Sequence, residues 1–321
     1  MISTLDLVLA KPRGFCAGVD RAITIVERAL DLYGPPIYIR HEIVHNPHVV
    51  RRLQQRGAIF VEDLEEVPSG AWVIFSAHGV SPAIREEAKS LGLRALDATC
   101  PLVTKVHLEA QRYAEQGFAI VLIGHRDHVE VQGTVGEAPD CIFVVSTVKE
   151  VENLVIPDKN KIAYLTQTTL SLDDTAEIVS VLKKKFPNIQ GPSKEDICYA
   201  TQNRQNAVKA MTNEVDLILV LGAPNSSNTL RLVEVAQASG ILARRIESAE
   251  EILPGWLEGI SRIGITAGAS APEDIVQDII KTLKALSSNN TLKEMILVEE
   301  NVTFALPSIL KSVPPSNGKS L

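Results

Sequence analysis

Short apolar, β-branched runs recur along the chain, and each is followed by a loop and then by a stretch with helical periodicity. Five runs show this pattern clearly and a sixth is a further candidate: DLVLAKP, WVIFSAHG, FAIVLIGH, DLILVLGA and RIGITAGA, then KIAYLTQ. Strands that alternate with helices in this way are typical of α/β units with parallel strands. The sequence therefore predicts an α/β fold with mostly parallel sheets.

Length and charge narrow the class of protein further. The 321 residues exceed what one hydrophobic core usually spans, and a hydrophobic content of 45% excludes a disordered chain. With 32 basic and 39 acidic residues the formal net charge is −7, which argues against a nucleic-acid binder. No apolar run reaches the roughly 20 residues of a membrane helix, and the first residues do not resemble a signal peptide. We therefore expect a cytoplasmic protein that binds neither membrane nor nucleic acid.

Helix starts follow directly on the predicted strands. Ser81 precedes Pro82 at a first helical position, and Pro272 opens another helix with Glu273 and Asp274 in its first turn. In open α/β sheets the loops that leave the carboxyl ends of strands also expose helix N-termini, and ligands bind at that edge. Functional residues are therefore expected on these strand-to-helix loops.

Three of the four cysteines have similar surroundings. Cys16 and Cys100 are 84 positions apart, Cys100 and Cys198 are 98 apart, and each precedes a helical pattern. Each thiol is therefore expected near a helix N-terminus, where the macrodipole favours the thiolate. Cys141 instead begins an apolar strand and is expected to be a core thiol.

The cysteine spacing predicts three similar α/β domains. We place them at residues 1–98, 99–193 and 194–285, with one of the three helix-start cysteines in each. Residues 286–321 would form a C-terminal extension, and its last residues resemble an extended tail with little regular structure.

Spacing alone leaves three roles open for these cysteines. They are too few and too spread for a disulfide scaffold, and they lack the C-x₂-C pairs of structural zinc sites. If the domains meet at a centre, three thiolates could hold three corners of a cubane iron–sulfur cluster and leave one iron without a protein ligand. A three-cysteine zinc site and inert core thiols are equally compatible with the spacing.

Other loop residues could bind an anion. His78 follows a strand and precedes a helix start, so it is expected to face a cleft. Ser226, Ser227 and Asn228 lie together at another strand-to-helix junction, where N-capping needs only one such residue. Their hydroxyl and amide donors suit a phosphate at the helix N-terminus, and Ser270 has a similar position near the helix that Pro272 opens.

One carboxylate could transfer a proton. Glu130 lies two residues after His128 within one of the loop motifs, and a partly desolvated glutamate can hold or relay a proton. Thr168 offers a hydroxyl for such a relay, while a solvated surface position for Glu130 stays an alternative. The run Lys183–Lys185 precedes Pro187 and is interpreted as a solvated helix end.

Together these motifs resemble the 4-hydroxy-3-methylbut-2-enyl diphosphate reductase family, which performs the last step of the non-mevalonate isoprenoid pathway. The resemblance covers nearly the whole chain and depends on ten motifs in this order: GFCAGVDRAI, VHNPHVV, FSAHGVS, DATCPLVTKVH, GHRDHVEV, TQTTLS, DDT, DICYATQNRQ, GAPNSSNT and TAGASAP. One position departs from the family, because Val129 stands where proline is common. We expect a loop of different stiffness with an unchanged spacing between His128 and Glu130.

The resemblance implies a cofactor and a substrate site. It implies one [4Fe–4S] cluster per subunit, held at the centre of three α/β domains by three protein ligands, Cys16, Cys100 and Cys198. It places the catalytic residues Glu130, Thr168 and His128 at the substrate, the first two near its hydroxyl. It also implies that the diphosphate is held by His45, His78, His128, Ser226, Ser227, Asn228 and Ser270.

The implied reaction is reductive dehydroxylation. The allylic alcohol of 4-hydroxy-3-methylbut-2-enyl diphosphate would bind the iron without a protein ligand, a Lewis acid. Two electrons and two protons would convert the substrate to isopentenyl diphosphate and dimethylallyl diphosphate and release water. A ferredoxin or flavodoxin is the implied electron donor, and the anchor is expected to work without Mg²⁺.

Two other functions remain compatible with the same residues. An iron–sulfur sensor would use the three thiols but would not need the serine and asparagine donors. A zinc hydrolase or transferase that acts on a phosphorylated substrate would use both. Iron and sulfide content separates the last of these from the reductase.

Overall fold

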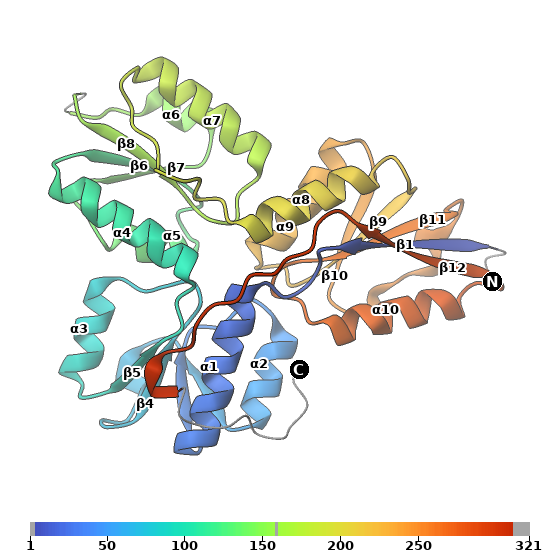
Figure 1. The fold of residues 1–321 in the computed structure, drawn as a ribbon, viewed down its shortest axis with the longest axis horizontal. Coiled ribbons are helices and arrows are strands. Elements are labelled where there is room, and N and C mark those ends of the chain that lie inside the picture. Colours follow the sequence, from blue (N-terminus) through green and yellow to red (C-terminus); the bar gives the residue numbers. More distant parts are fainter. Residues whose placement is uncertain (1–3, 158–159, 311–321) are drawn as a thin grey trace.

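The computed structural model describes residues 4–157 and 160–310. Three lobes surround a common centre, and each contains one parallel sheet covered by helices (Figure 1). The predicted α/β class with parallel sheets is confirmed. Among the described helices, none combines the length and apolarity that a bilayer-spanning helix needs.

The first lobe is built on a four-stranded sheet with the strand order β3-β2-β4-β5. Its strands are β2 (Ile37–Arg40), β3 (Ala58–Val61), β4 (Trp72–Phe75) and β5 (Arg94–Asp97). Its helices are α1 (Ala17–Tyr33), α2 (Pro47–Gln55), the 3₁₀ turn η1 (Leu64–Glu66) and α3 (Pro82–Ser90). As predicted, Ser81 caps α3 and Pro82 is its first residue.

The second lobe is built on a three-stranded sheet with the order β7-β6-β8. Its strands are β6 (Ala119–Ile123), β7 (Ile142–Val145) and β8 (Ile162–Thr166). Its helices are α4 (Pro101–Glu115), α5 (Val129–Val135), α6 (Val148–Asn153) and α7 (Leu172–Lys185). The run Lys183–Lys185 forms the last turn of α7, which confirms that it ends a helix.

The third lobe is built on a five-stranded sheet with the order β10-β9-β11-β1-β12. Its strands are β1 (Leu5–Lys11), β9 (Leu217–Leu221), β10 (Leu242–Ile246), β11 (Arg262–Ala267) and β12 (Asn290–Ile296). Its helices are α8 (Tyr199–Met211), α9 (Ser227–Ala238), the 3₁₀ turns η2 (Ala249–Glu251) and η3 (Pro254–Leu257), and α10 (Glu273–Ala285). Pro272 is the N-cap of α10 rather than its first residue.

Strand β1 changes the expected domain boundaries. It was expected in a first domain of residues 1–98, but it lies between β11 and β12 in the sheet of the third lobe. Its leucines at positions 5, 7 and 9 pack on one face of that sheet and Val8 on the other, as in a central parallel strand. A strand followed by a helix has the same local pattern whether the chain stays in one lobe or crosses to another.

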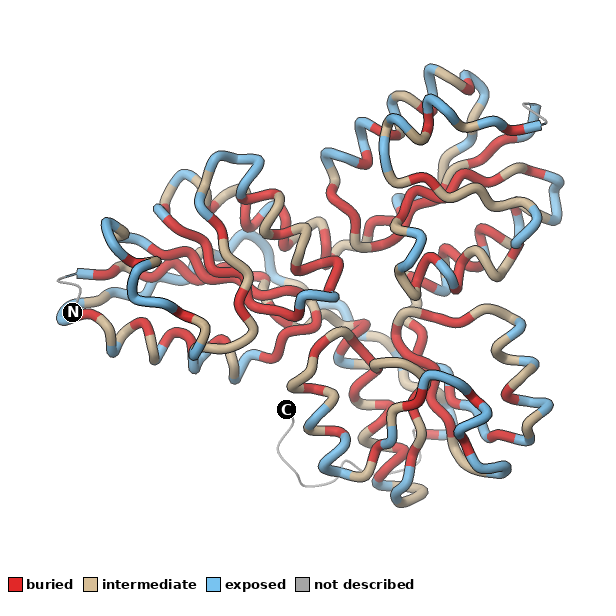
Figure 2. The backbone as a smooth tube through the Cα atoms, turned by 180° about the vertical axis from the view of Figure 1, so that it is seen from behind, coloured by how far each residue is buried: buried red, intermediate tan, exposed pale blue. Residues whose placement is uncertain are grey.

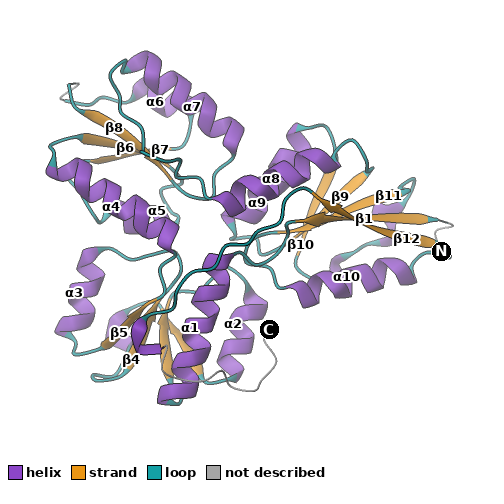
Figure 3. Ribbon diagram, viewed as in Figure 1, coloured by secondary structure: helices purple, strands orange, loops and turns teal. Residues whose placement is uncertain are grey.

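The C-terminal extension also has more structure than expected. Strand β12 pairs with β1, and residues 297–310, here called the C-terminal strap, then cross from the third lobe to the first (Figures 1 and 3). The strap ends in the 3₁₀ turn η4 (Ser308–Leu310), where the fully buried Leu310 joins the core around α1. The tail predicted beyond residue 310 lies outside the described residues.

Each lobe has buried apolar clusters on both faces of its sheet. Figure 2 shows buried segments along the strands of every lobe and at the centre where the lobes meet. Helices on both faces are what all-parallel sheets require. The carboxyl ends of the strands are therefore free to present their loops to the centre.

Candidate functional site

Three helices present a cysteine to the centre, one from each lobe. Cys16 is the N-cap of α1, Cys100 that of α4 and Cys198 that of α8. The three residues line one pocket with a cavity of about 110 Å³. Three positive helix ends therefore converge where the thiols meet, and their field offsets part of the cost of burying thiolates there.

Two of the sulfur atoms approach the same glycine. A Cβ atom added to Gly18 would lie 2.7 Å from Sγ of Cys100 and 3.8 Å from Sγ of Cys16. Gly18 is the second residue of α1, so the absent side chain lets the thiol on α4 come close to α1. Only glycine at position 18 leaves room for Cys100 of the second lobe to approach Cys16 of the first lobe.

We predict that Gly18→Ala lowers the iron bound per chain, because the new methyl group displaces Cys100. Alanine favours a helix over glycine by about 1 kcal/mol, so the fold itself should not suffer. Gly255→Ala is the control, since its Cβ would meet no atom within 4 Å. Iron analysis after anaerobic reconstitution checks this, and full iron content in Gly18→Ala would contradict the packing argument.

The thiols fit a cationic inorganic group. Burial, followed by the neighbouring Cys16, raises the pKa of Cys100 to about 12 and of Cys198 to about 11, and burial also raises the pKa of Cys16. Among the described residues that line the pocket there is no lysine or arginine to compensate three thiolates. Soft thiolates select iron–sulfur clusters, zinc or copper, whose positive metal ions provide that compensation.

A cluster and a single ion make different geometric demands. Within the described residues no three His, Cys, Asp or Glu side chains form a group that could hold one metal ion. Thiolates bound to different irons of a cluster are further apart than thiolates bound to one ion. Three thiolates are donors of the number and chemistry that a cubane cluster with one open iron would need.

Three histidines form the next part of the pocket. The rings of His45 and His78 stack with centroids 4.1 Å apart, and His128 meets them edge-on at 5.5 and 5.9 Å. Burial, then His45, lowers the pKa of His78 well below its usual value and that of His128 to about 4. The two imidazoles are therefore neutral at pH 7 and can donate hydrogen bonds to an anion.

We predict that His128 makes the cluster-free protein less stable as the pH falls. Its pKa of about 4 lies below the ordinary 6.5, so the unfolded chain binds the proton first and stability is lost from pH 6.5 downward. From pH 7 to pH 5 the loss is roughly 2 kcal/mol. Asn suits the N-cap of α5, which His128 occupies, so His128→Asn should reduce the loss without uncapping the helix. Urea unfolding at both pH values checks this, and equal losses in both proteins would contradict it.

The third lobe contributes hydroxyl and amide groups. Ser226 caps α9, while Ser227 Oγ accepts a 2.9 Å hydrogen bond from Thr169 of the second lobe. Asn228 Oδ1 accepts a hydrogen bond from the backbone N–H of Ala269. Ser270 Oγ donates to the backbone carbonyl of His45 in the first lobe. These four predicted residues (226, 227, 228 and 270) are buried and line the pocket, and only Ser226 is used as a cap.

Glu130 is buried in the first turn of α5, with 4% of its surface exposed. Its Oε1 accepts from the backbone N–H of Thr168 at 2.6 Å, and its Oε2 accepts from the Thr168 hydroxyl at 3.0 Å. Burial raises the pKa of Glu130 above its usual value, although the Thr168 hydrogen bonds lower it. The alternative of a solvated surface carboxylate is therefore wrong.

All twelve predicted site residues line this one pocket. Two threonines were not predicted, Thr169 and Thr201, and both line it too. Thr201 shares a hydrogen bond with Sγ of Cys198 at 3.2 Å, and Thr169 lies beside Thr168 in the sequence. The sequence could have indicated them, because Thr201 lies one helical turn after Cys198 and Thr169 lies next to Thr168.

The prediction for Cys141 was wrong. Cys141 precedes β7, is half-buried rather than a core thiol, and does not line the pocket.

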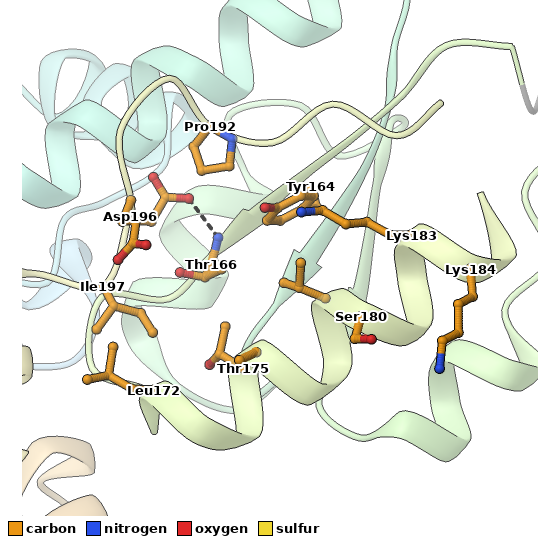
Figure 4. Close-up of a pocket in the computed structure, with 13 residues that line it drawn as sticks. Tyr164, Thr166, Leu172, Thr175, Ser180, Lys183, Lys184, Pro192, Asp196 and Ile197 are labelled. Atoms are coloured by element: carbon orange, nitrogen blue, oxygen red, sulfur yellow. Dashed lines mark hydrogen bonds between the residues drawn. The ribbon is translucent and has the colours of Figure 1, made fainter. Parts of the chain in front are cut away.

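A larger cavity, of about 670 Å³, lies between α7 and the chain before Cys198 (Figure 4). None of the predicted site residues lines it. Asp196 contributes to its wall: Oδ2 accepts from the backbone N–H of Thr166 at 2.8 Å, and Oδ1 accepts from Nζ of Lys105 at 2.6 Å. Burial raises the pKa of Asp196 to about 6. Asp196 thus ties the segment before Cys198 to β8 and α4.

The fold and site define a three-lobed α/β protein whose central pocket combines three thiols with neutral anion-binding donors. A family model described as LytB protein matches residues 7–284. The chain therefore belongs to the LytB family, which confirms the resemblance seen in its motifs.

Curated relatives carry one enzyme name. The chain is 57% identical over 306 residues to the 4-hydroxy-3-methylbut-2-enyl diphosphate reductase of Azoarcus sp. (strain BH72). The matched region covers 95% of this chain and 98% of that relative. The chain is 56% identical over 307 residues to the enzyme of the same name from Acidithiobacillus ferrooxidans, at 95% and 97% coverage. A solved structure of E-1-hydroxy-2-methyl-but-2-enyl-4-diphosphate reductase from Plasmodium falciparum matches with a TM-score of 0.91 and 43% identity, covering 96% of this chain and 97% of that one.

Proposed function

We propose that this chain reduces 4-hydroxy-3-methylbut-2-enyl diphosphate to isopentenyl diphosphate and dimethylallyl diphosphate. The reaction consumes two electrons and two protons and releases the hydroxyl group as water. One observation carries the proposal: three thiols, three histidines, a buried carboxyl and four polar donors from the third lobe line a single pocket. The relatives that bear the reductase name match this chain over nearly its full length.

The three thiols are the proposed ligands of one [4Fe–4S] cluster. When bound, such a cluster supplies electrons one at a time and offers a Lewis-acidic iron that has no protein ligand. Cys16, Cys100 and Cys198 each belong to a different lobe, so loading the cluster would join all three lobes. A ferredoxin or flavodoxin in the cytoplasm is the proposed electron donor.

The diphosphate anchor combines donors from all three lobes. His45 and His78 come from the first lobe, His128 from the second, and the serine and asparagine donors from the third. Imidazoles, hydroxyls, an amide and the N-terminus of α9 can hold a diphosphate without Mg²⁺. Binding the diphosphate would hold the allylic end of the substrate toward the thiols.

Glu130 is the proposed proton donor. Its raised pKa favours the protonated carboxyl, and the 3.0 Å contact between its Oε2 and Oγ1 of Thr168 provides a relay path. Either Glu130 or Thr168 would give the proton to the substrate hydroxyl, which then leaves as water. The surrounding burial excludes bulk water from this transfer.

The test is turnover of the anaerobically reconstituted protein with reduced methyl viologen in the presence of EDTA. We expect two viologen radicals to be oxidised per molecule of allylic diphosphate, and both isopentenyl and dimethylallyl diphosphate as products. A brown protein that binds the diphosphate without oxidising viologen would support a sensor instead. A colourless protein with stoichiometric zinc would support a hydrolase or transferase.

A further inference from the structure

A buried arginine contacts the backbone of the Cys16 loop. The side chain of Arg204 is completely buried, and its Nε and Nη2 donate to the carbonyl of Gly14 at 3.2 and 2.7 Å. Nη2 also donates to the carbonyl of Phe15 at 3.3 Å. The guanidinium group thus lies against the two residues that precede Cys16.

The same arginine joins two further segments. It lies on α8, six residues after Cys198, and its Nη1 donates to the carbonyl of Ala200 at 2.9 Å. Nη1 also pairs with a carboxylate of the C-terminal strap, at 3.0 Å from Oε1 of Glu300. The carboxylate is held by Asn203 as well, whose Nδ2 donates to Oε1 at 2.9 Å. Glu300 is therefore fixed beside the guanidinium by two residues of α8.

The charges of Arg204 and Glu300 can influence Cys16 electrostatically without contacting the substrate. Neither Arg204 nor Glu300 lines the substrate pocket, so neither contacts a bound diphosphate. The Arg204 side chain is fully buried and that of Glu300 is 13% exposed, so water and salt screen their charges only weakly. In agreement, burial raises the pKa of the Cys16 thiol, Arg204 lowers it and Glu300 raises it.

We propose that Arg204 and Glu300 tune the reduction potential of the group held by Cys16. The cation of Arg204 raises the potential, because it stabilises the more negative reduced state, and the carboxylate of Glu300 lowers it. Arg204 and Glu300 are positioning residues that act through Cys16. This inference rests on the proposed function, since it requires a redox group bound by the three thiols.

The direction in which each variant shifts the midpoint potential distinguishes electrostatic tuning from a structural role. Arg204→Gln removes the cation and should shift the midpoint potential downward, whereas Glu300→Gln removes the anion and should shift it upward. Both substitutions break the same ion pair, so a purely structural role would give two shifts of the same direction or none. Arg204→Lys keeps the charge and should stay closer to wild type than Arg204→Gln.

The experiment is an anaerobic redox titration of the iron-loaded proteins, followed by visible absorbance and EPR. The control is Arg52→Gln, which breaks an ion pair of similar length between Arg52 and Asp274. Neither residue lines the pocket, so this variant should leave the potential unchanged. Opposite shifts in Arg204→Gln and Glu300→Gln are expected, and shifts of one sign or no shifts would overturn the inference.

Iron and sulfide content of each protein completes the design. If Arg204→Gln does not retain iron, Glu300→Gln decides alone: an upward shift supports the inference, and an unchanged or lower potential overturns it. A wild-type protein that binds no iron and sulfide would overturn the proposed function together with this inference. An iron-loaded wild type with the wrong shifts overturns the inference alone.

Discussion

Glu130→Gln loses about 10²- to 10⁴-fold in turnover at pH 7, the usual contribution of a positioned general acid. The amide keeps the size of the side chain: its oxygen can accept the hydrogen bond from the backbone N–H of Thr168, and its NH₂ group can donate to the Thr168 hydroxyl, but it has no acidic proton to give. Iron content and diphosphate affinity should stay close to wild type, because Glu130 is expected neither to bind the cluster nor to hold the diphosphate. Single-turnover kinetics with reduced viologen measure the loss.

The pH profile tests the same residue independently. Burial raises the pKa of Glu130, so its proton persists to higher pH than in an ordinary glutamate, and activity should fall as the pH rises through that raised pKa. Glu130→Gln should lack this limb. Glu150→Gln is the control. Glu150 lies in the first turn of α6, as Glu130 lies in the first turn of α5, but the side chain of Glu150 is exposed at the surface, so this variant should keep the wild-type pH profile. Near-normal turnover of Glu130→Gln would remove Glu130 from the proton path.

Cys100→Ser abolishes stable binding of the cluster. The serine hydroxyl does not form the soft thiolate that iron–sulfur sites require, and two cysteines remain for three corners. The variant should be nearly colourless after reconstitution and should lose the stabilisation that metal binding gives the folded state. Its melting temperature should therefore match that of cluster-free wild type.

Cys141→Ser is the matched control for Cys100→Ser. Cys141 is also half-buried but does not line the pocket, so this variant should retain full iron and sulfide content. Retention of a complete cluster by Cys100→Ser would show that another residue holds the third corner. Iron, sulfide and visible absorbance, measured on both variants side by side, decide between these outcomes.

The local part of the fold was predictable from the sequence. Alternating apolar runs and helix starts specify strands and helices through short-range patterns, and Ser81 and the Lys183–Lys185 run lie where those patterns place them. The choice of sheet for each strand is a long-range property. The strand β1 was predicted from its apolar run, but its place in the sheet of the third lobe was not, because that run fits the centre of any parallel sheet.

The site residues were predictable for a similar reason. Most of them lie on a strand-to-helix loop or in the first turn of the helix that follows it, whereas Cys198 follows α7. Local pattern therefore placed them at helix starts, but their convergence on one centre was implied by the family resemblance and not by spacing alone. Arg204 and Glu300 carry no such signal. Arg204 lies inside α8, where an arginine is ordinarily exposed, and Glu300 lies on the C-terminal strap, which has no periodic pattern. The burial of Arg204 and its ion pair with Glu300 depend on the assembled lobes.

The most direct test of the account is the composition of the wild-type protein after anaerobic purification and reconstitution. We predict four iron and four sulfide per chain, as in one [4Fe–4S] cluster, with a brown spectrum that changes on addition of the allylic diphosphate. A colourless protein, or one that binds zinc in place of iron and sulfide, would contradict the claim that three cysteines from three lobes hold a redox cluster.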